Sequence, residues 1–111
     1  MENAQQIFEN HMRAVNALDP GLVAQDYAED ALFITPDNTY NGNKEIYSFY
    51  KGFLPNFKEF EFITVKQETN GNVVYFVWSG KNKEIDIKIA MDTYIIENGK
   101  IKQHTFLSIT D

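Results

Sequence analysis

Two residues that could carry protons, Asp92 and His104, lie near the two ends of the stretch MDTYIIENGKIKQH. The stretch runs from Met91 to His104 and has the pattern of two β-strands joined by a tight turn. A carboxylate beside an imidazole holds the ring in one tautomer and favours its charged form, which suits a proton carrier. The chemistry therefore depends on whether the hairpin brings both side chains to one face of the sheet.

Two turns could join these strands, and they place the two residues differently. A two-residue loop at 98–99 sets Asp92 opposite Thr105 and points Asp92 and His104 to opposite faces. A three-residue loop at 97–99, with Gly99 in the left-handed conformation, pairs Asp92 directly with His104. Local turn preferences favour the shorter loop.

A third candidate, His11, lies on the first of three expected helices. Apolar residues recur at helical spacing over residues 3–18, and His11 lies at the edge of that stripe. An imidazole at this position would face the same interior as the hairpin residues.

The order of the remaining elements indicates the fold that must position these residues. Asp19 followed by Pro20 begins a second helix that should end near Glu29, and Asn43 can cap a third helix over residues 44–54. Strands are expected over 31–35, 59–69, 73–79, 84–96 and 100–109, with a loop at 36–42. This order predicts one α+β domain, residues 1–111, with the helices packed on one face of a curved antiparallel sheet.

The longest expected strand has no polar face, which bears on oligomeric state. Strict alternation separates its side chains into two sets: Ile85, Ile87, Ile89, Met91, Thr93 and Ile95 on one face, and Asp86, Lys88, Ala90, Asp92, Tyr94 and Ile96 on the other. Three helices can cover only one face of the sheet. We therefore expect a homodimer in which the uncovered sheet face packs against a partner chain.

Composition excludes several classes of partner. Sixteen acidic and ten basic residues give a net charge of −6, which opposes binding to nucleic acid and to anionic lipid. The first thirty residues contain no apolar run of signal-peptide length, so neither secretion nor membrane insertion is expected, and a cytoplasmic location is the default.

No cofactor or metal is expected from the residues present. The chain lacks cysteine, a phosphate-binding glycine loop and a serine nucleophile elbow. His11, Asp92 and His104 are types that bind metals, but they come from three segments without diagnostic spacing.

Several short motifs, taken in order, resemble those of a known family. The motif positions are Tyr27, Ala28, Asp30, Gly42, Ile46, Asp92, Gly99, Lys100 and Ile101. Together they resemble the SnoaL-like branch of the nuclear transport factor two-like superfamily over nearly the whole chain. The resemblance implies a cone-shaped roll, in which a curved mixed, mainly antiparallel sheet curls round three helices and leaves a mostly apolar pocket. It also favours the three-residue loop, which we adopt.

Ketosteroid isomerase offers the nearest chemical comparison within that superfamily. That enzyme uses a carboxylate base and an oxyanion hole made of a tyrosine and a protonated aspartic acid. The resemblance carries these three positions onto Thr35, His11 and Asp92 of this chain. Because a threonine cannot take up a proton at neutral pH, steroid isomerisation by that mechanism is not expected.

The adopted register predicts which residues line the pocket. Tyr94 and Phe106 should lie beside the Asp92–His104 pair, and Thr35 and Tyr47 are the further candidates for contacting a substrate. The ligand should be a small, partly apolar molecule.

The reaction expected from this site is cofactor-free proton transfer of the isomerase, cyclase or dehydratase kind. Asp92 and His104 would act as acid and base, and His11 would donate a hydrogen bond to a developing oxyanion. Two alternatives stay open: the buried pair could be purely structural, and the domain could be a non-catalytic ligand-binding or dimeric association module.

Overall fold

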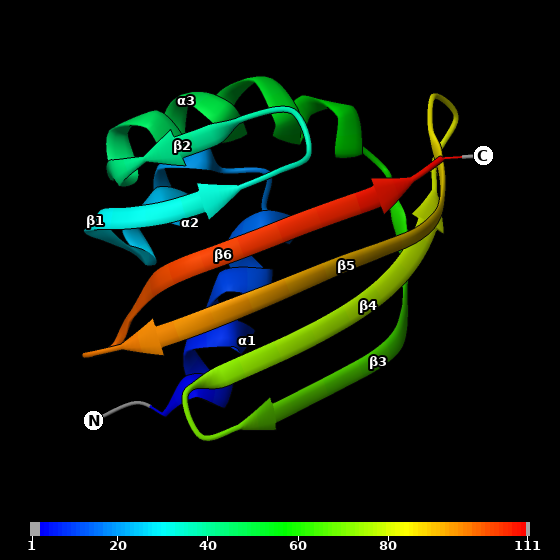
Figure 1. Ribbon diagram of the computed structural model, residues 1–111. Coiled ribbons are helices and arrows are strands. Elements are labelled where there is room, and N and C mark those ends of the chain that lie inside the picture. The colour runs from blue at the N-terminus through cyan, green and yellow to red at the C-terminus, as the bar shows by residue number, and fades with distance from the viewer. Residues whose placement is uncertain (1–2, 111) are drawn as a thin grey trace.

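The computed structural model describes residues 3–110 and contains three helices on one face of a six-stranded sheet (Figure 1). The helices are α1 (Ala4–Asn16), α2 (Pro20–Gln25) and α3 (Gly42–Phe53), followed by a short 3-10 helix, η1 (Leu54–Phe57). The strands are β1 (Tyr27–Ile34), β2 (Thr39–Asn41), β3 (Glu61–Asn70), β4 (Val73–Lys81), β5 (Asp86–Glu97) and β6 (Lys100–Ile109).

The sheet has the strand order β2-β1-β6-β5-β4-β3. Strands β1 and β6 are parallel, and every other neighbouring pair is antiparallel. Figure 1 shows the sheet curving around the helices. The predicted α+β roll with a mixed, mainly antiparallel sheet is therefore confirmed. Within residues 3–110, no helix combines the length and the apolar character needed to cross a membrane.

Helix α1 carries His11 into the core. A capping box fixes the start of the helix: the Asn3 side chain accepts from the Gln6 backbone N–H, and the Gln6 side chain accepts from the Asn3 backbone N–H. The apolar stripe then buries Ile7, Phe8 and Ala14, and His11 is buried with them at 0% exposure. His11 is thus an interior residue rather than a residue at the edge of the stripe.

Helix α2 is shorter, and β1 longer, than the sequence predicted. Asp19 caps α2 as expected, but the helix ends at Gln25 rather than near Glu29. Tyr27 already belongs to β1, where it pairs with Ile101 of β6 and is almost completely buried. Pairing with a strand more than seventy residues away outweighs the local helical pattern.

The segment predicted as a loop after β1 contains the edge strand β2. Its three residues pair with the end of β1, from Leu32 to Ile34. Helix α3 follows at once, with Asn41 rather than Asn43 at the cap position, and the Glu45 side chain accepts a hydrogen bond from the Asn41 backbone N–H. The predicted helix is confirmed, but it begins two residues earlier.

The hairpin between β5 and β6 turns through two residues, so the three-residue loop was wrong. Asn98 and Gly99 have φ values of 53° and 76°, and Glu97 pairs with Lys100. Positive φ at both central positions is the mirror-image type I turn that matches the twist of the flanking strands.

With a regular ladder, this two-residue turn would point Asp92 and His104 to opposite faces of the sheet. A β-bulge in β6 brings them back to the same face. Ile96 pairs with Ile101, but Ile95 pairs with Gln103, so Lys102 is an extra residue in β6. The register beyond the bulge pairs Asp92 with Phe106, and it sets His104 opposite Tyr94, the next inward residue of β5. Asp92 and His104 therefore lie on the same face as diagonal neighbours, and the expectation that they meet is confirmed.

A second bulge changes the face of Ile87. Trp78 pairs with Ala90, but Gly80 pairs with Ile87, so β5 contains one extra residue between these pairs. Ile87 is consequently buried in the core with Ala90, although strict alternation had placed it with Ile89 on the outer face.

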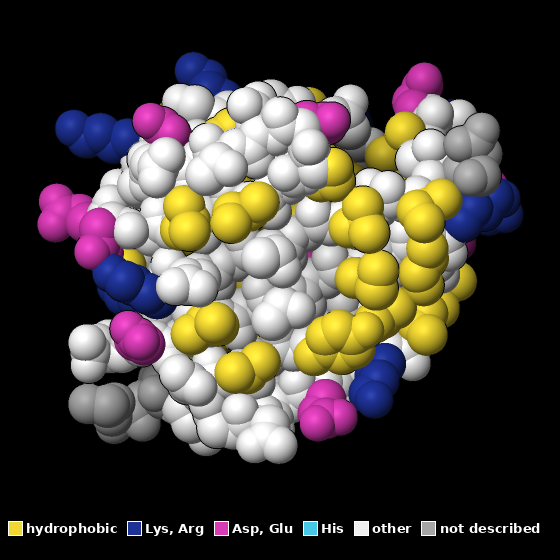
Figure 2. Space-filling model, in the orientation of Figure 1, with side chains coloured by type: hydrophobic (Ala, Val, Ile, Leu, Met, Phe, Trp, Pro, Cys, Tyr) yellow, Lys and Arg dark blue, Asp and Glu magenta, His cyan; other side chains and the backbone are white. Residues whose placement is uncertain are grey.

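The outer face of the sheet, away from the helices, is rich in exposed apolar side chains. Six strand residues of this kind are at least 37% exposed: Ile34, Ile63, Val65, Tyr75, Leu107 and Ile109. Figure 2 shows apolar side chains gathered over this face of the molecule. Most of the apolar residues that alternate with them, such as Phe33 and Phe106, point inward.

Candidate functional site

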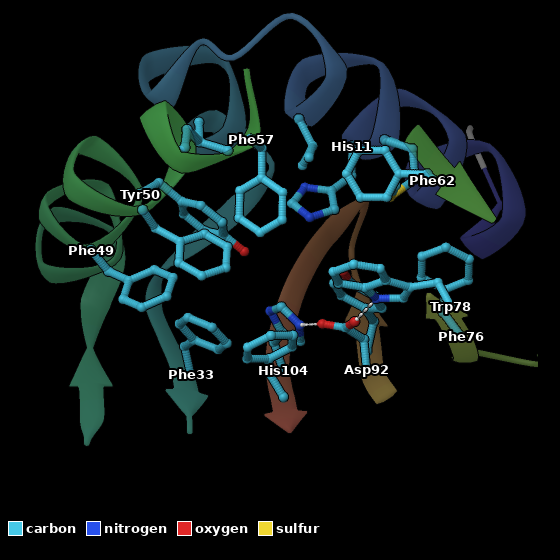
Figure 3. Close-up of a pocket in the computed structure, with 16 residues that line it drawn as sticks. His11, Phe33, Phe49, Tyr50, Phe57, Phe62, Phe76, Trp78, Asp92 and His104 are labelled. Carbon is cyan, nitrogen blue, oxygen red and sulfur yellow. Dashed lines mark hydrogen bonds and ion pairs between the residues drawn. The ribbon is translucent and has the colours of Figure 1, made fainter. Parts of the chain in front are cut away.

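A small aromatic cavity lies between the helices and the sheet (Figure 3). Ten of its sixteen lining residues are Phe, Tyr or Trp, and its charged or titratable members include His11, Asp92 and His104. Its volume is about 40 Å³, which is room for a few water molecules at roughly 10–15 Å³ each. A larger ligand must displace lining side chains in order to enter.

Asp92 is held by two hydrogen-bond donors at the base of the cavity. The indole Nε1–H of Trp78 donates to Oδ2 at 2.7 Å, and His104 Nε2 lies 2.6 Å from Oδ1. The Asp92 residue is only 5% exposed. Because an ionised carboxylate accepts and cannot donate, the proton between His104 and Asp92 belongs to His104 Nε2.

The other ring nitrogen of His104 is also occupied. His104 Nδ1 lies 2.8 Å from the Tyr27 hydroxyl, which in turn lies 2.8 Å from the Tyr50 hydroxyl. Burial lowers the pKa of His104 below its usual 6.5, and this desolvation outweighs the opposite effect of Asp92. The ring is therefore neutral, rather than charged as its pairing with a carboxylate had suggested.

A neutral His104 fixes the direction of the hydrogen-bond chain. Tyr50 donates to Tyr27, Tyr27 donates to His104 Nδ1, and His104 Nε2–H donates to Asp92. Burial raises the pKa of Tyr27 and of Tyr50, so both remain protonated donors. The chain runs from α3 through β1 and β6 to β5 and ties the helix layer to the sheet.

The ring of His11, in the lining of the cavity, has one nitrogen with a hydrogen-bond partner among the described residues and one without. Its Nδ1 lies 3.2 Å from Asp26 Oδ2, whereas its Nε2 is buried without a hydrogen-bond partner within residues 3–110. The His11 ring packs edge-on against Tyr94 and His104, with centroid separations of 5.3 and 6.4 Å. Figure 3 shows it reaching from the helix layer toward the Asp92–His104 pair.

Asp26 orients His11 from the side opposite the cavity. The Asp26 side chain is 21% exposed and therefore remains in contact with solvent. As a carboxylate, Asp26 accepts a hydrogen bond from Nδ1–H of His11. In the neutral form of the ring, this contact leaves the lone pair of Nε2 facing the cavity.

The structure brings together five of the seven residues that the sequence singled out. His11, Asp92, Tyr94, His104 and Phe106 all line the cavity.

Thr35 and Tyr47 lie outside the lining of the cavity. The Thr35 hydroxyl organises the turn after β1 by accepting from the backbone N–H groups of Asp37 and Asn38. Tyr47 is 38% exposed and lines a shallow surface depression between α2 and α3.

Four partners of the site escaped the sequence reasoning: Asp26, Tyr27, Tyr50 and Trp78. Tyr27 belonged to a recognised motif, whereas Trp78 and Tyr50 lie among apolar residues in a pattern that is typical of packing. No local sequence pattern singles out Asp26. Its contact with His11 depends on how α1 packs against the end of α2, which the sequence pattern does not show. Within the described part of the chain, no group of three or more His, Cys, Asp or Glu side chains is arranged to hold a metal ion.

The neutral state of His104 makes stability depend on pH. The folded protein holds the pKa of His104 below the 6.5 of an unfolded chain, so the unfolded state binds more protons as the pH falls. This contribution is fully present above pH about 6.5 and is lost as the pH falls through the folded pKa. We expect a lower Tm near pH 5 than near pH 7.5.

His104→Gln is the matched variant for this prediction. Its amide can donate to Asp92 and accept from Tyr27 but does not titrate, so the fall in Tm between the two pH values should be smaller. An equal fall in both proteins would assign the pH dependence to other groups.

The SnoaL-like domain family matches the chain over residues 8–104. That range contains every lining residue of the cavity except Phe106. Comparison with curated proteins gave no match.

Several solved structures share the fold at low sequence identity. An NTF2-like protein of unknown function from Cytophaga hutchinsonii has a TM-score of 0.77 and 16% identity, and the alignment covers 98% of this chain and 92% of that protein. A candidate isomerase of the SnoaL-like family from Agrobacterium tumefaciens has a TM-score of 0.74 and 19% identity, with coverage of 98% and 99%. A candidate ketosteroid isomerase from Kribbella flavida has a TM-score of 0.81 and 11% identity, with coverage of 97% and 78%.

At such identities these likenesses establish the fold and not the activity. The family match covers most of the chain, and the helices, the curved sheet and the cavity agree with it. The chain therefore belongs to the SnoaL-like domain family.

Proposed function

We propose that this domain binds a small, partly apolar molecule in the cavity and catalyses cofactor-free proton transfer of the isomerase, cyclase or dehydratase kind. The cavity supplies an apolar, water-poor setting, in which the charge of a buried carboxylate acts more strongly than it would in water.

One observation carries this proposal: Nε2 of His11 is buried at the cavity without a partner in the described residues. Native proteins satisfy nearly all buried polar atoms, and an exception calls for a partner, such as a ligand or a bound water, or for a catalytic role. The opposite nitrogen of the same ring is anchored to Asp26. A base oriented by a carboxylate, with its free nitrogen toward a cavity, is the arrangement that general base catalysis requires.

The roles of the three titratable groups follow from their hydrogen bonds. His11 has the lone pair that can take a proton, and Asp92 has acceptor capacity left after its two bonds. His104 has both nitrogens occupied and acts as a positioning residue for Asp92. The oxyanion-donor role expected for His11 would apply only after it has gained a proton.

A chromogenic probe of buried bases, 5-nitrobenzisoxazole, tests the proposal without knowledge of the natural substrate. His11 Nε2 takes the proton from C3 of the probe, the N–O bond breaks, and a nitrile and a coloured phenolate form. We expect turnover above that of free imidazole at equal concentration. His11→Phe should lower kcat/KM by roughly 100-fold or more, since a positioned base contributes about 10²–10⁴.

Two controls make this result interpretable. His11→Phe removes an unsatisfied buried atom, and the partly exposed Asp26 can be hydrated, so Tm should not fall. Tyr47→Phe changes an aromatic residue outside the cavity and should keep the wild-type rate. Turnover that is equal in wild type and His11→Phe would overturn the proposal.

We also propose that the chain forms a homodimer through the outer face of the sheet. The exposed side chains of Ile34, Tyr75 and Leu107 support this, because contiguous apolar patches on soluble proteins commonly mark interfaces. This interface would also serve the second candidate function, a non-catalytic association module.

Sedimentation velocity at micromolar concentration tests the dimer. We expect the wild type to sediment as a dimer and Leu107→Lys, at a 40% exposed position of β6, to shift it toward the monomer. Leu22→Lys alters an exposed leucine of α2, away from the sheet, and should have no effect. A wild type that sediments as a 12.9 kDa monomer would refute the interface.

A further inference from the structure

The hydrogen-bond donors around the cavity are largely used within the protein. Trp78 and His104 both donate to Asp92, Tyr27 donates to His104, and Tyr50 donates to Tyr27. These four donor groups have no hydrogen left to offer a ligand.

The Tyr94 hydroxyl, which also lines the cavity, hydrogen-bonds to Asp92 as well, and burial together with this contact raises the pKa of Tyr94. The remaining free capacity of the cavity is therefore that of an acceptor. His11 Nδ1 is engaged with Asp26, so the neutral form of the ring presents only the lone pair of Nε2 to the cavity. The Asp92 carboxylate has further lone pairs and adds a negative charge at the other side of the same space. An anionic ligand would be repelled, and a ligand with acceptors alone would leave His11 unsatisfied.

The shape of the lining specifies the rest of the ligand. The walls are mostly aromatic rings, such as those of Phe33, Phe49 and Phe57 (Figure 3), which suit a planar apolar body. Met12 and Phe62 are only partly buried, and both also line a surface groove between α1 and β3. Displacing these two side chains would open the 40 Å³ cavity to that groove.

We infer that the cavity selects a neutral, planar aromatic molecule bearing a hydroxyl group, and that this hydroxyl donates its hydrogen bond to His11 Nε2. The inference rests on the proposed function and adds the polar group that the ligand must carry.

Phenol and fluorobenzene form a matched pair of probes for this inference. They are similar in size, and only phenol can donate a hydrogen bond. Dissociation constants come from NMR titration of wild type and His11→Phe, followed on signals of cavity residues and on the ring nitrogens of His11. We expect wild type to bind phenol more tightly than fluorobenzene. Loss of the acceptor in His11→Phe should shift this preference toward fluorobenzene by roughly tenfold, because a stranded donor loses its full hydrogen bond.

The tautomer of His11 gives an independent test on the unaltered protein. Long-range ¹H–¹⁵N spectra should show Nδ1 protonated and Nε2 unprotonated at neutral pH, with Nε2 shifting on addition of phenol. A protonated Nε2 in neutral His11 would overturn the inference, even if the His11→Phe variant failed to fold.

The outcomes separate this inference from the proposed function. If both probes bind and their preference is the same in wild type and His11→Phe, the hydroxyl selectivity is refuted, whereas the ligand-binding cavity stands. If neither probe perturbs the cavity residues, small-molecule binding itself fails and the proposed function fails with it. Tyr47→Phe, outside the cavity, should reproduce the wild-type preference.

Discussion

Asp92→Ala is expected to lower the free energy of unfolding by about 2 kcal/mol, because it strands two buried donors at roughly 1–3 kcal/mol each. The donors are Nε1–H of Trp78 and Nε2–H of His104, and both groups are almost fully buried. Relief from desolvating the carboxylate offsets part of this loss. Urea denaturation followed by tryptophan fluorescence measures it, with Trp78 as the only tryptophan.

Asp86→Ala is the matched control on the same strand. Asp86 pairs with Lys88, and both side chains are more than half exposed. Its removal should change stability far less than removal of Asp92. Similar small changes in both variants would mean that Asp92 is not held by its two donors.

Phe33→Ala should destabilise the protein by about 3–5 kcal/mol, the usual cost of emptying a buried phenylalanine site. Phe33 is 1% exposed, and its ring stacks on His104 with a centroid separation of 4.4 Å. The same ring also contacts Phe49 and Tyr50, so a cavity remains where it was. Chemical denaturation gives the magnitude.

Leu22→Ala serves as the control for this second variant. Leu22 is 46% exposed on α2, and its truncation creates no internal void. Because the emptied Phe33 site joins the cavity, Phe33→Ala should also bind aromatic probes that are larger than those the wild type binds. A loss no greater than that of Leu22→Ala would show that the core collapses around the missing ring.

The sequence predicted the elements well because their apolar periodicities are strong. The stripe over α1, the cap at Asp19 and the alternation of β5 all correspond to observed structure. Boundaries failed where tertiary pairing decided them: Tyr27 joins β1 because β6 pairs with it. The fold family was identified from motifs that these same elements carry.

The candidate site was predictable only in part, because hydrogen-bond partners are set by packing. Asp92, His104 and His11 were found as chemistry-bearing residues, and their convergence was right. The predicted three-residue loop was wrong, since the turn has two residues. The bulge at Lys102 places Asp92 and His104 on the same face instead. The contact of His11 with Asp26, which fixes the free nitrogen, depends on how α1 packs against the end of α2.

The unpaired residue Lys102 decides which alternate side chains of β6 face the cavity. If Lys102 were paired with Ile95 instead of bulging out, Gln103, Thr105 and Leu107 would face the cavity, and His104 and Phe106 would turn to the outside. Deletion of Lys102 would leave the pairs Tyr94–His104 and Asp92–Phe106 as they are, because the ladder does not pair this residue.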